Sequence, residues 1–207
     1  MKLPELAAAA QRLRTPPRPS NFRTTACLAT YPWLLATARD LGSDPWAWFC
    51  RVAVMTYGWM PRVLRLDLQH ARAAAQALHA AREATPATMR QLDIAPIASS
   101  VRSVVGASKM LHFVNPQVYP IWDSRIEAMR LGGAAGMAHM GIADHYWRYC
   151  DDVHRLRGEA GFRDFHAQMQ AALDARLRRE GLPAYAITEV RAIELAASEL
   201  SADHDEG

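Results

Sequence analysis

Apolar residues recur mainly every three or four positions along this chain of 207 residues, and that spacing most restricts its fold. Such a period places apolar side chains on one face of an α-helix, whereas a half-buried strand needs strict alternation. The sequence contains no convincing alternating run of β-branched residues and no repeat at the period of a solenoid protein. It therefore predicts an all-α protein, with two packed helical lobes and a cleft between them.

Turn and capping residues divide the apolar pattern into separate helices. The segment around Pro32 is expected to form one helix, or two helices broken near Pro32, and Ser43-Asp44-Pro45 is a strong helix start. The predicted helices are Leu3–Leu13, Thr24–Leu41, Trp46–Trp59, Leu64–Ala84, Ile94–Phe113, Asp123–Leu131, His145–Leu156, Phe162–Arg179 and Thr188–Leu200.

Three parts of the chain differ in composition. Residues 1–22 predict a helix followed by a proline-rich connector, and residues 23–197 predict one helical domain. Glycines between 132 and 142 mark a possible hinge between lobes. The acidic segment 198–207 is expected to be a disordered tail.

Charge and cysteine content exclude several classes of protein. The formal charge of +3 is compatible with nucleic acid but far from a polybasic tract. The apolar runs are too short for a membrane span and the first residues lack the order of a secretory signal, so we expect a cytoplasmic protein. Three scattered cysteines and the absence of HExxH spacing suggest no metal site, and we expect no cofactor.

The segment from Val104 to Leu131 organises the rest of the chain. A helix must stop near Asn115, because the residue before Pro116 is disfavoured in helical geometry. The apolar stretch from Tyr119 to Trp122 then leads to Asp123, whose carboxylate can accept hydrogen bonds from the first amides of a second helix. The sequence thus predicts an acid at a helix N-terminus, approached through aromatic residues.

The stretch from Ile121 to Gly132, with the sequence IWDSRIEAMRLG, resembles the core of the helix-hairpin-helix DNA glycosylase superfamily. That core has Val-Asp-Thr-His-Val running on to Arg-Leu-Gly, and Ala107 lies sixteen residues before Asp123, close to the family spacing. The chain is also similar, more closely, to bacterial proteins of no assigned activity with the pattern ASK-x-LHF-x-NP-x(3)-PI-x-DS. The superfamily resemblance implies a glycosylase-like helix-loop-helix core, Asp123 as the catalytic carboxylate and DNA as the partner.

Other positions depart from the superfamily pattern. Where the hairpin reads Leu-Pro-Gly-Val-Gly, this chain has the segment from Ser99 to Ser103 and no glycine. Val105 stands where lyase-type members carry their lysine, and the four-cysteine iron-sulfur pattern is absent. The resemblance therefore implies a monofunctional glycosylase that uses water, with DNA contacts made by side chains.

Each candidate site residue has a structural alternative. Asp123 is either a catalytic acid or a helix cap. Tyr119, Trp122 and Trp147 could stack on an extruded base or fill the core. His112 could contact the substrate or be a hydrogen-bonded core histidine. The candidate cations for DNA phosphates are Arg102, Lys109, Arg125 and Arg130, of which the first three are the main candidates.

Two functions follow from these residues. The first is hydrolysis of the N-glycosidic bond of a flipped modified or mispaired base. The alternative is a non-catalytic helical protein that keeps the glycosylase-like core to bind nucleic acid or protein. An unrelated helical interaction module, whose DSRI match is chance, is a third possibility.

Overall fold

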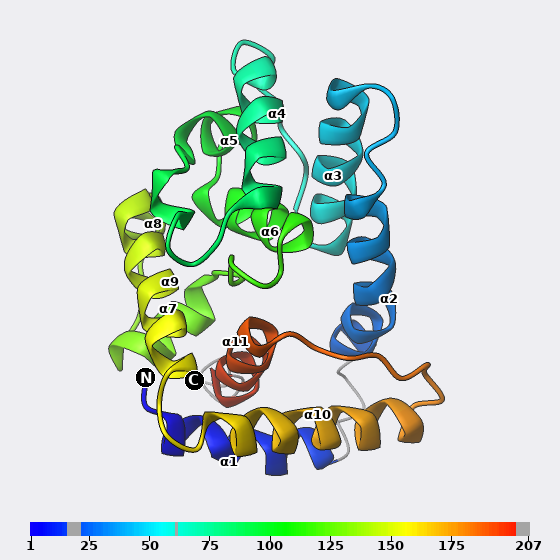
Figure 1. Cartoon of the computed structure of the whole chain (residues 1–207), viewed down its shortest axis with the longest axis vertical. Helices are drawn as coiled ribbons and strands as arrows, with labels where there is room; N and C mark the ends of the chain where they lie inside the picture. The colour runs from blue at the N-terminus through cyan, green and yellow to red at the C-terminus, as the bar shows by residue number, and fades with distance from the viewer. Residues whose placement is uncertain (16–21, 61, 202–207) are drawn as a thin grey trace. The chain divides into compact units, whose positions relative to one another are not determined.

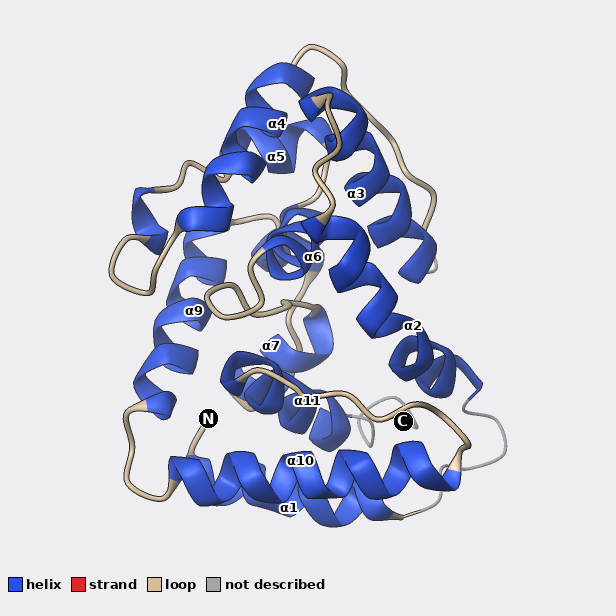
Figure 2. Cartoon of the chain, turned by 45° about the vertical axis from the view of Figure 1, so that its right-hand side comes forward, coloured by secondary structure: helices blue, strands red, loops and turns tan. Residues whose placement is uncertain are grey.

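The computed structural model describes residues 1–15, 22–60 and 62–201, and this part of the chain contains helices and no strand (Figures 1 and 2). The all-α prediction is confirmed. The α-helices are α1 (Leu3–Arg14), α2 (Phe22–Arg39), α3 (Pro45–Trp59), α4 (Ala71–Ala80), α5 (Ala95–Ser100), α6 (Val104–Val114), α7 (Ser124–Leu131), α8 (Met137–Met140), α9 (Ala143–Arg157), α10 (Phe162–Arg179) and α11 (Glu189–Ser201). The 3-10 helices are η1 (Ala81–Glu83) and η2 (Met89–Gln91).

Parts of two predictions fall outside the described residues. These are the proline-rich connector, in residues 16–21, and most of the acidic tail, in residues 202–207. The beginning of the predicted tail is helical, because α11 extends through Ser201. None of the described helices is both long and apolar enough to cross a membrane.

The chain divides into two compact units, neither of which is continuous in sequence. Unit 1 contains residues 1–32, 123–135 and 151–207, and unit 2 contains residues 33–122 and 136–150. The boundaries between units therefore include the peptide bond between Trp122 and Asp123, within the segment that organises the sequence.

Unit 1 is built on α1, α7, α10 and α11. Helices α1 and α10 lie side by side, and α11 packs on both of them and on α7 (Figure 2). Leu6 and Leu13 of α1 and Met169 and Leu173 of α10 are fully buried. Burial of such apolar faces is the main source of stability for helices of this length.

Unit 2 is organised around α6, which contacts α3, α4 and α5. Every residue from Gly106 to Val114 is buried, so α6 is covered on all sides. Trp48 and Phe49 of α3 are also fully buried, as expected for a helix that is apolar on nearly every face. The Tyr57 hydroxyl donates to the Val101 carbonyl oxygen at 2.9 Å and joins α3 to the residue after α5.

The helix boundaries at α3 and α6 follow from their capping residues. Asp44 Oδ1 accepts from the Trp46 amide at 2.9 Å, and Pro45 occupies the first turn of α3. Ser103 Oγ accepts from the Gly106 amide at 2.9 Å and caps α6. Helix α6 ends at Val114, immediately before Asn115-Pro116, as predicted.

The prediction of one helix from Leu64 to Ala84 is wrong for its first seven residues, since α4 begins at Ala71. The Asp67 amide donates to the Ser100 carbonyl oxygen at 2.7 Å, and Asp67 Oδ1 accepts from the Gln69 amide. These bonds hold Asp67 in a turn. The partner in α5 is distant in sequence, so the local apolar pattern could not reveal it.

Two further helix predictions can be compared with the structure. The predicted helix from Ile94 to Phe113 is two helices, α5 and α6, because the chain turns at residues 101–103. Arg102 in this turn has a left-handed backbone with φ of 52°. For α2, where one helix or two were both expected, the structure has a single helix that runs through Pro32.

Candidate functional site

Asp123 is the N-cap of α7. Its backbone is extended, and its Oδ1 accepts hydrogen bonds from the amides of Arg125 at 3.1 Å and Ile126 at 3.0 Å. The residue is part-exposed. Because both amides bond the same oxygen, the carboxylate has a fixed orientation, and Oδ2 is the oxygen that takes part in neither capping bond.

Helix α7 is held by a buried ion pair one turn after Asp123. Glu127 is fully buried and accepts two hydrogen bonds from Arg130, Nε to Oε2 and Nη2 to Oε1, each at 2.7 Å. Arg130 Nη1 also donates to Asp152 Oδ2 at 3.0 Å. Hydrogen bonding to Glu127 is the main cause that raises the pKa of Arg130. Arg130 is therefore engaged within unit 1, which argues against the role of a phosphate-facing cation.

In unit 2, the approach to Asp123 is fixed to α6 by side-chain hydrogen bonds. The buried His112 ring forms an Nδ1 contact of 2.8 Å with the Tyr119 carbonyl oxygen. Ser108 Oγ accepts from the Trp122 amide at 3.2 Å and donates to the Val105 carbonyl oxygen at 2.8 Å. His112 thus takes the hydrogen-bonded core position considered as its alternative role, and Ser108 is a positioning residue that the sequence analysis missed.

The aromatic candidates belong to one cluster of unit 2. Tyr146 lies between Trp122 and Trp147, with ring centroids 5.9 Å and 5.2 Å away, and Tyr119 is 6.3 Å from Trp147. Tyr119 and Trp122 are fully buried, so neither presents an open ring face in this conformation. Trp147 is part-exposed. The core alternative therefore describes Tyr119 and Trp122 better than the stacking role.

The Tyr119 hydroxyl is a buried polar group. Among the described residues it has no hydrogen-bond partner. Burial, and to a smaller extent the nearby Cys150 thiol, raise the pKa of Tyr119 well above its ordinary value. The hydroxyl is therefore neutral at physiological pH and is available as a hydrogen-bond donor only if the cluster rearranges.

The candidate DNA-binding cations occupy different environments. Lys109 is buried at 7% exposure, with Nζ 5.7 Å from the centre of the Trp59 ring, so in this conformation it is covered rather than presented to a phosphate, and its DNA contact stays a prediction. Arg102 is mostly exposed and lies 3.5 Å from Asp67 in an ion pair. Arg125 is exposed in the first turn of α7.

The turn between α5 and α6 forms without glycine. The Val101 amide donates to the Ile97 carbonyl oxygen at 3.1 Å, and the Ser103 amide donates to the Ala98 carbonyl oxygen at 2.9 Å. Arg102 adopts the left-handed geometry that glycine would adopt at lower cost. Since these amides are already bonded within the turn, a phosphate here would be met by side chains, as the missing glycines imply.

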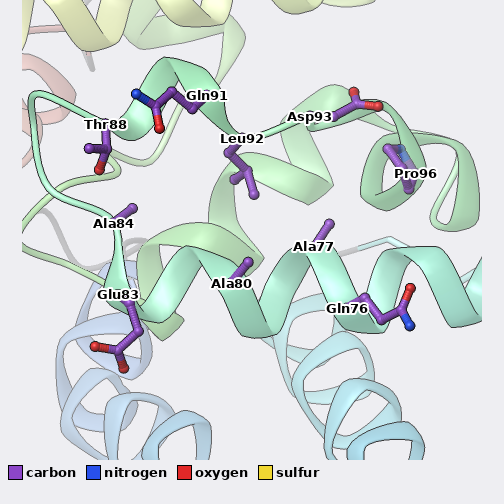
Figure 3. A pocket seen from close by; sticks show the side chains of 10 residues that line it. All are labelled: Gln76, Ala77, Ala80, Glu83, Ala84, Thr88, Gln91, Leu92, Asp93 and Pro96. Carbon is purple, nitrogen blue, oxygen red and sulfur yellow. The ribbon is translucent and has the colours of Figure 1, made fainter.

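Two hollows of the described surface are lined by other residues than these candidates. One, of about 570 Å³, lies beside α4 (Figure 3), and the other, of about 450 Å³, lies beside residues 157–164. Neither is lined by Asp123, His112, Tyr119 or Trp122.

The candidates are divided between the two units. Asp123, Arg125 and Arg130 belong to unit 1, and the others, namely Arg102, Lys109, His112, Tyr119, Trp122 and Trp147, belong to unit 2. No protein-family model matches this chain, and searches of curated proteins and of solved structures found no match either.

Proposed function

We propose that the chain is a DNA-glycosylase-like enzyme that hydrolyses the N-glycosidic bond of a flipped modified or mispaired base. The observation that carries this proposal is the Asp123 carboxylate, fixed at the start of α7 by two amides on one oxygen. A carboxylate near C1′ of an extruded nucleotide stabilises the positive charge that develops as the bond to the base breaks. The short helix-turn-helix formed by α5 and α6, in the position of the family hairpin, supports the same assignment.

The proposed reaction uses water as the nucleophile. Val105, at the position of the lyase lysine, carries a hydrocarbon and cannot form an imine. Lys109, one turn later on α6, is packed against Trp59. Asp123 orients or activates the attacking water, and the product is an intact strand with an abasic site. The enzyme would act on DNA in the cytoplasm.

The alternative is a non-catalytic helical protein that binds nucleic acid or protein through the same core. Its support is the burial of Tyr119, Trp122 and Lys109, which leaves these candidates for base and phosphate recognition inside unit 2. For the enzyme, base recognition would instead involve the part-exposed Trp147 or a rearranged aromatic cluster.

Replacing Asp123 by Asn separates catalysis from capping. Asn caps helices about as well as Asp but carries no charge, so the variant is expected to keep its melting temperature and lose base excision. The assay incubates the full chain with a panel of damaged and phage-type modified duplexes and detects abasic sites by alkaline cleavage.

Asp44→Asn is the matched control, because Asp44 caps α3 through Oδ1 in the same way. This variant is expected to retain both stability and excision. Excision that survives in Asp123→Asn would contradict the catalytic assignment. If the wild-type chain releases no base from any duplex in the panel, the non-catalytic alternative becomes the better description.

A further inference from the structure

Exposed arginines gather where α1 and α10 end. The two helices lie side by side in unit 1 (Figures 1 and 2). Arg179 Nη1 donates to the Arg14 carbonyl oxygen at 2.7 Å, so the C-terminal ends of both helices meet. Arg178 and Arg12 are in the same last turns, and all four arginines are exposed. We refer to these four residues as the arginine surface.

Two of these arginines cover backbone oxygens that would repel an anion. The last carbonyl oxygens of a helix carry partial negative charge and have no partner within the helix. Arg179 donates to the carbonyl oxygens of Arg14 and Thr15 at the end of α1, at 2.7 Å and 3.4 Å. Arg12 donates to two carbonyl oxygens in the last turn of α11, each at 3.4 Å. The guanidinium groups therefore offset the negative ends of both helices.

The carboxylates of the described residues around this surface are already hydrogen-bonded. Glu199 and Glu180 both accept from the buried Arg176, at 3.1 Å and 2.9 Å. Asp174, one turn before Arg178, accepts from a glutamine side chain at 2.8 Å. Because Arg176 offsets part of this negative charge, the four exposed arginines remain in excess, and the local field attracts anions.

Arg14 and Arg178 have unused hydrogen-bond donors. Neither side chain forms a hydrogen bond or an ion pair within the part of the chain that the structure describes. A guanidinium group carries paired N–H donors in one plane, which match two oxygens of a phosphate group. The arginine surface therefore offers free guanidinium groups of the kind that phosphate esters bind.

We propose that the arginine surface binds phosphates of the DNA backbone, an inference that rests on the proposed function. Of the cations expected to contact DNA, Lys109 is covered and Arg102 is paired with Asp67, so other cations must supply most of the contacts. Phosphates are closely and regularly spaced along a duplex, so clustered arginines can each contact one. Asp123 belongs to the same unit as this surface. The contacts hold the duplex and carry no sequence information.

The test compares two double variants of equal net charge. Arg14→Gln with Arg178→Gln removes two exposed arginines that have no partner among the described residues, so the fold should be kept. Arg72→Gln with Arg163→Gln is the matched control, because these arginines, on α4 and at the start of α10, are also exposed and form no such contact. Melting temperatures check folding. Fluorescence anisotropy measures binding of the full chain to an undamaged duplex at several salt concentrations.

Losing a phosphate contact lowers the slope of log affinity against log salt by about 0.9. The Arg14 and Arg178 variant is therefore expected to lose roughly 2 from this slope, and about tenfold or more in affinity near 0.1 M salt. The control variant should keep the slope and the affinity of the wild type. Residues 203, 205 and 206 add acidic side chains after α11 in the sequence, and replacing them with amides should leave affinity equal or tighter.

The outcomes separate this surface from the proposed enzyme. Binding that weakens only in the Arg14 and Arg178 variant supports the surface, even if no base is excised. Base excision by the wild type with equal affinities in both double variants would overturn the surface and leave the enzyme proposal standing. Absence of duplex binding at low salt, or weaker binding after the acidic residues become amides, would also overturn it. Polyglutamate that displaces the duplex at equal charge concentration would assign the surface to an acidic protein instead.

Discussion

Gly106 allows α6 to pass close to Tyr57 of α3. A Cβ atom at this position would lie 2.6 Å from the Tyr57 hydroxyl oxygen and 3.2 Å from the ring. The hydroxyl cannot withdraw without losing its bond to the Val101 carbonyl oxygen. Gly106→Ala is therefore expected to lower the free energy of unfolding by about 1–3 kcal/mol, measured by urea denaturation.

Gly58→Ala is the control for this prediction. Gly58 is also a helical glycine, in α3, but an added Cβ meets no atom within 4 Å. Alanine there removes only the flexibility of glycine and is expected to stabilise by about 0.5–1 kcal/mol. A gain of stability in both variants would mean that Tyr57 adjusts and that the close approach is unimportant.

Single residues differ in how far their roles could be predicted from sequence. The caps Asp44 and Asp123 were predictable, because a capping side chain acts on amides two or three residues away. The burial of Lys109 was not, since it depends on Trp59, fifty residues earlier in the chain. The same holds for Gly106, whose constraint comes from another helix.

At the scale of elements, α7 depends on the pair of Glu127 and Arg130. Arg130→Met removes two hydrogen bonds of 2.7 Å from the fully buried Glu127 carboxylate. The expected loss is about 3–5 kcal/mol in the free energy of unfolding, because removing one partner of a buried ion pair is strongly destabilising. The measurement is urea denaturation of the full chain.

An exposed ion pair provides the comparison for α7. Arg148 and Asp144 in α9 are 3.0 Å apart, and both side chains are more than half exposed. Arg148→Ala is expected to cost less than ~1 kcal/mol. Replacing Glu127 by Leu together with Arg130→Met should recover part of the loss, whereas equal losses in the single and double variants would show that packing of Arg130 matters more than its charge.

Helix termini with local signals were predicted better than breaks with distant causes. The start of α3 and the end of α6 are determined by Pro45 and by Asn115-Pro116. The turn that delays α4 depends on the backbone bond between Asp67 and Ser100, which are thirty-three residues apart. The spacing of apolar residues cannot reveal such a bond, because residues 64–70 have the same sequence pattern whether they form a helix or a turn.

At the scale of the whole molecule, the chain passes between its two units four times. One of these passages separates Trp122 from Asp123, and another lies between Ala135 and Gly136. The sequence predicted two lobes with a glycine hinge near the passage between Ala135 and Gly136, but no local pattern marks the passage between Trp122 and Asp123. Because neither unit is a continuous segment, every experiment proposed above uses the full chain.

Stability of the whole chain should depend on pH through Glu199. This carboxylate lies in unit 1 with Oε1 3.1 Å from Arg176 Nη1, and Arg12 and Arg191 are also near. Burial raises the pKa of Glu199 above its ordinary value of 4.5, in spite of these arginines. The folded chain therefore binds this proton more tightly than the unfolded chain. The stabilisation is fully present below the unfolded pKa and is lost as pH rises through the folded pKa.

Glu199→Gln removes this titration and keeps an oxygen that can accept from Arg176. As pH rises from the ordinary carboxyl range through the raised pKa of Glu199, the wild type should lose stability relative to the variant, with a slope of at most ~1.4 kcal/mol per pH unit, and above that pKa the difference should become constant. Free energies of unfolding in urea across this range provide the measurement. A wild type that gains on the variant as pH rises would mean that the attraction of Arg176 exceeds the effect of burial and that the pKa of Glu199 is lowered.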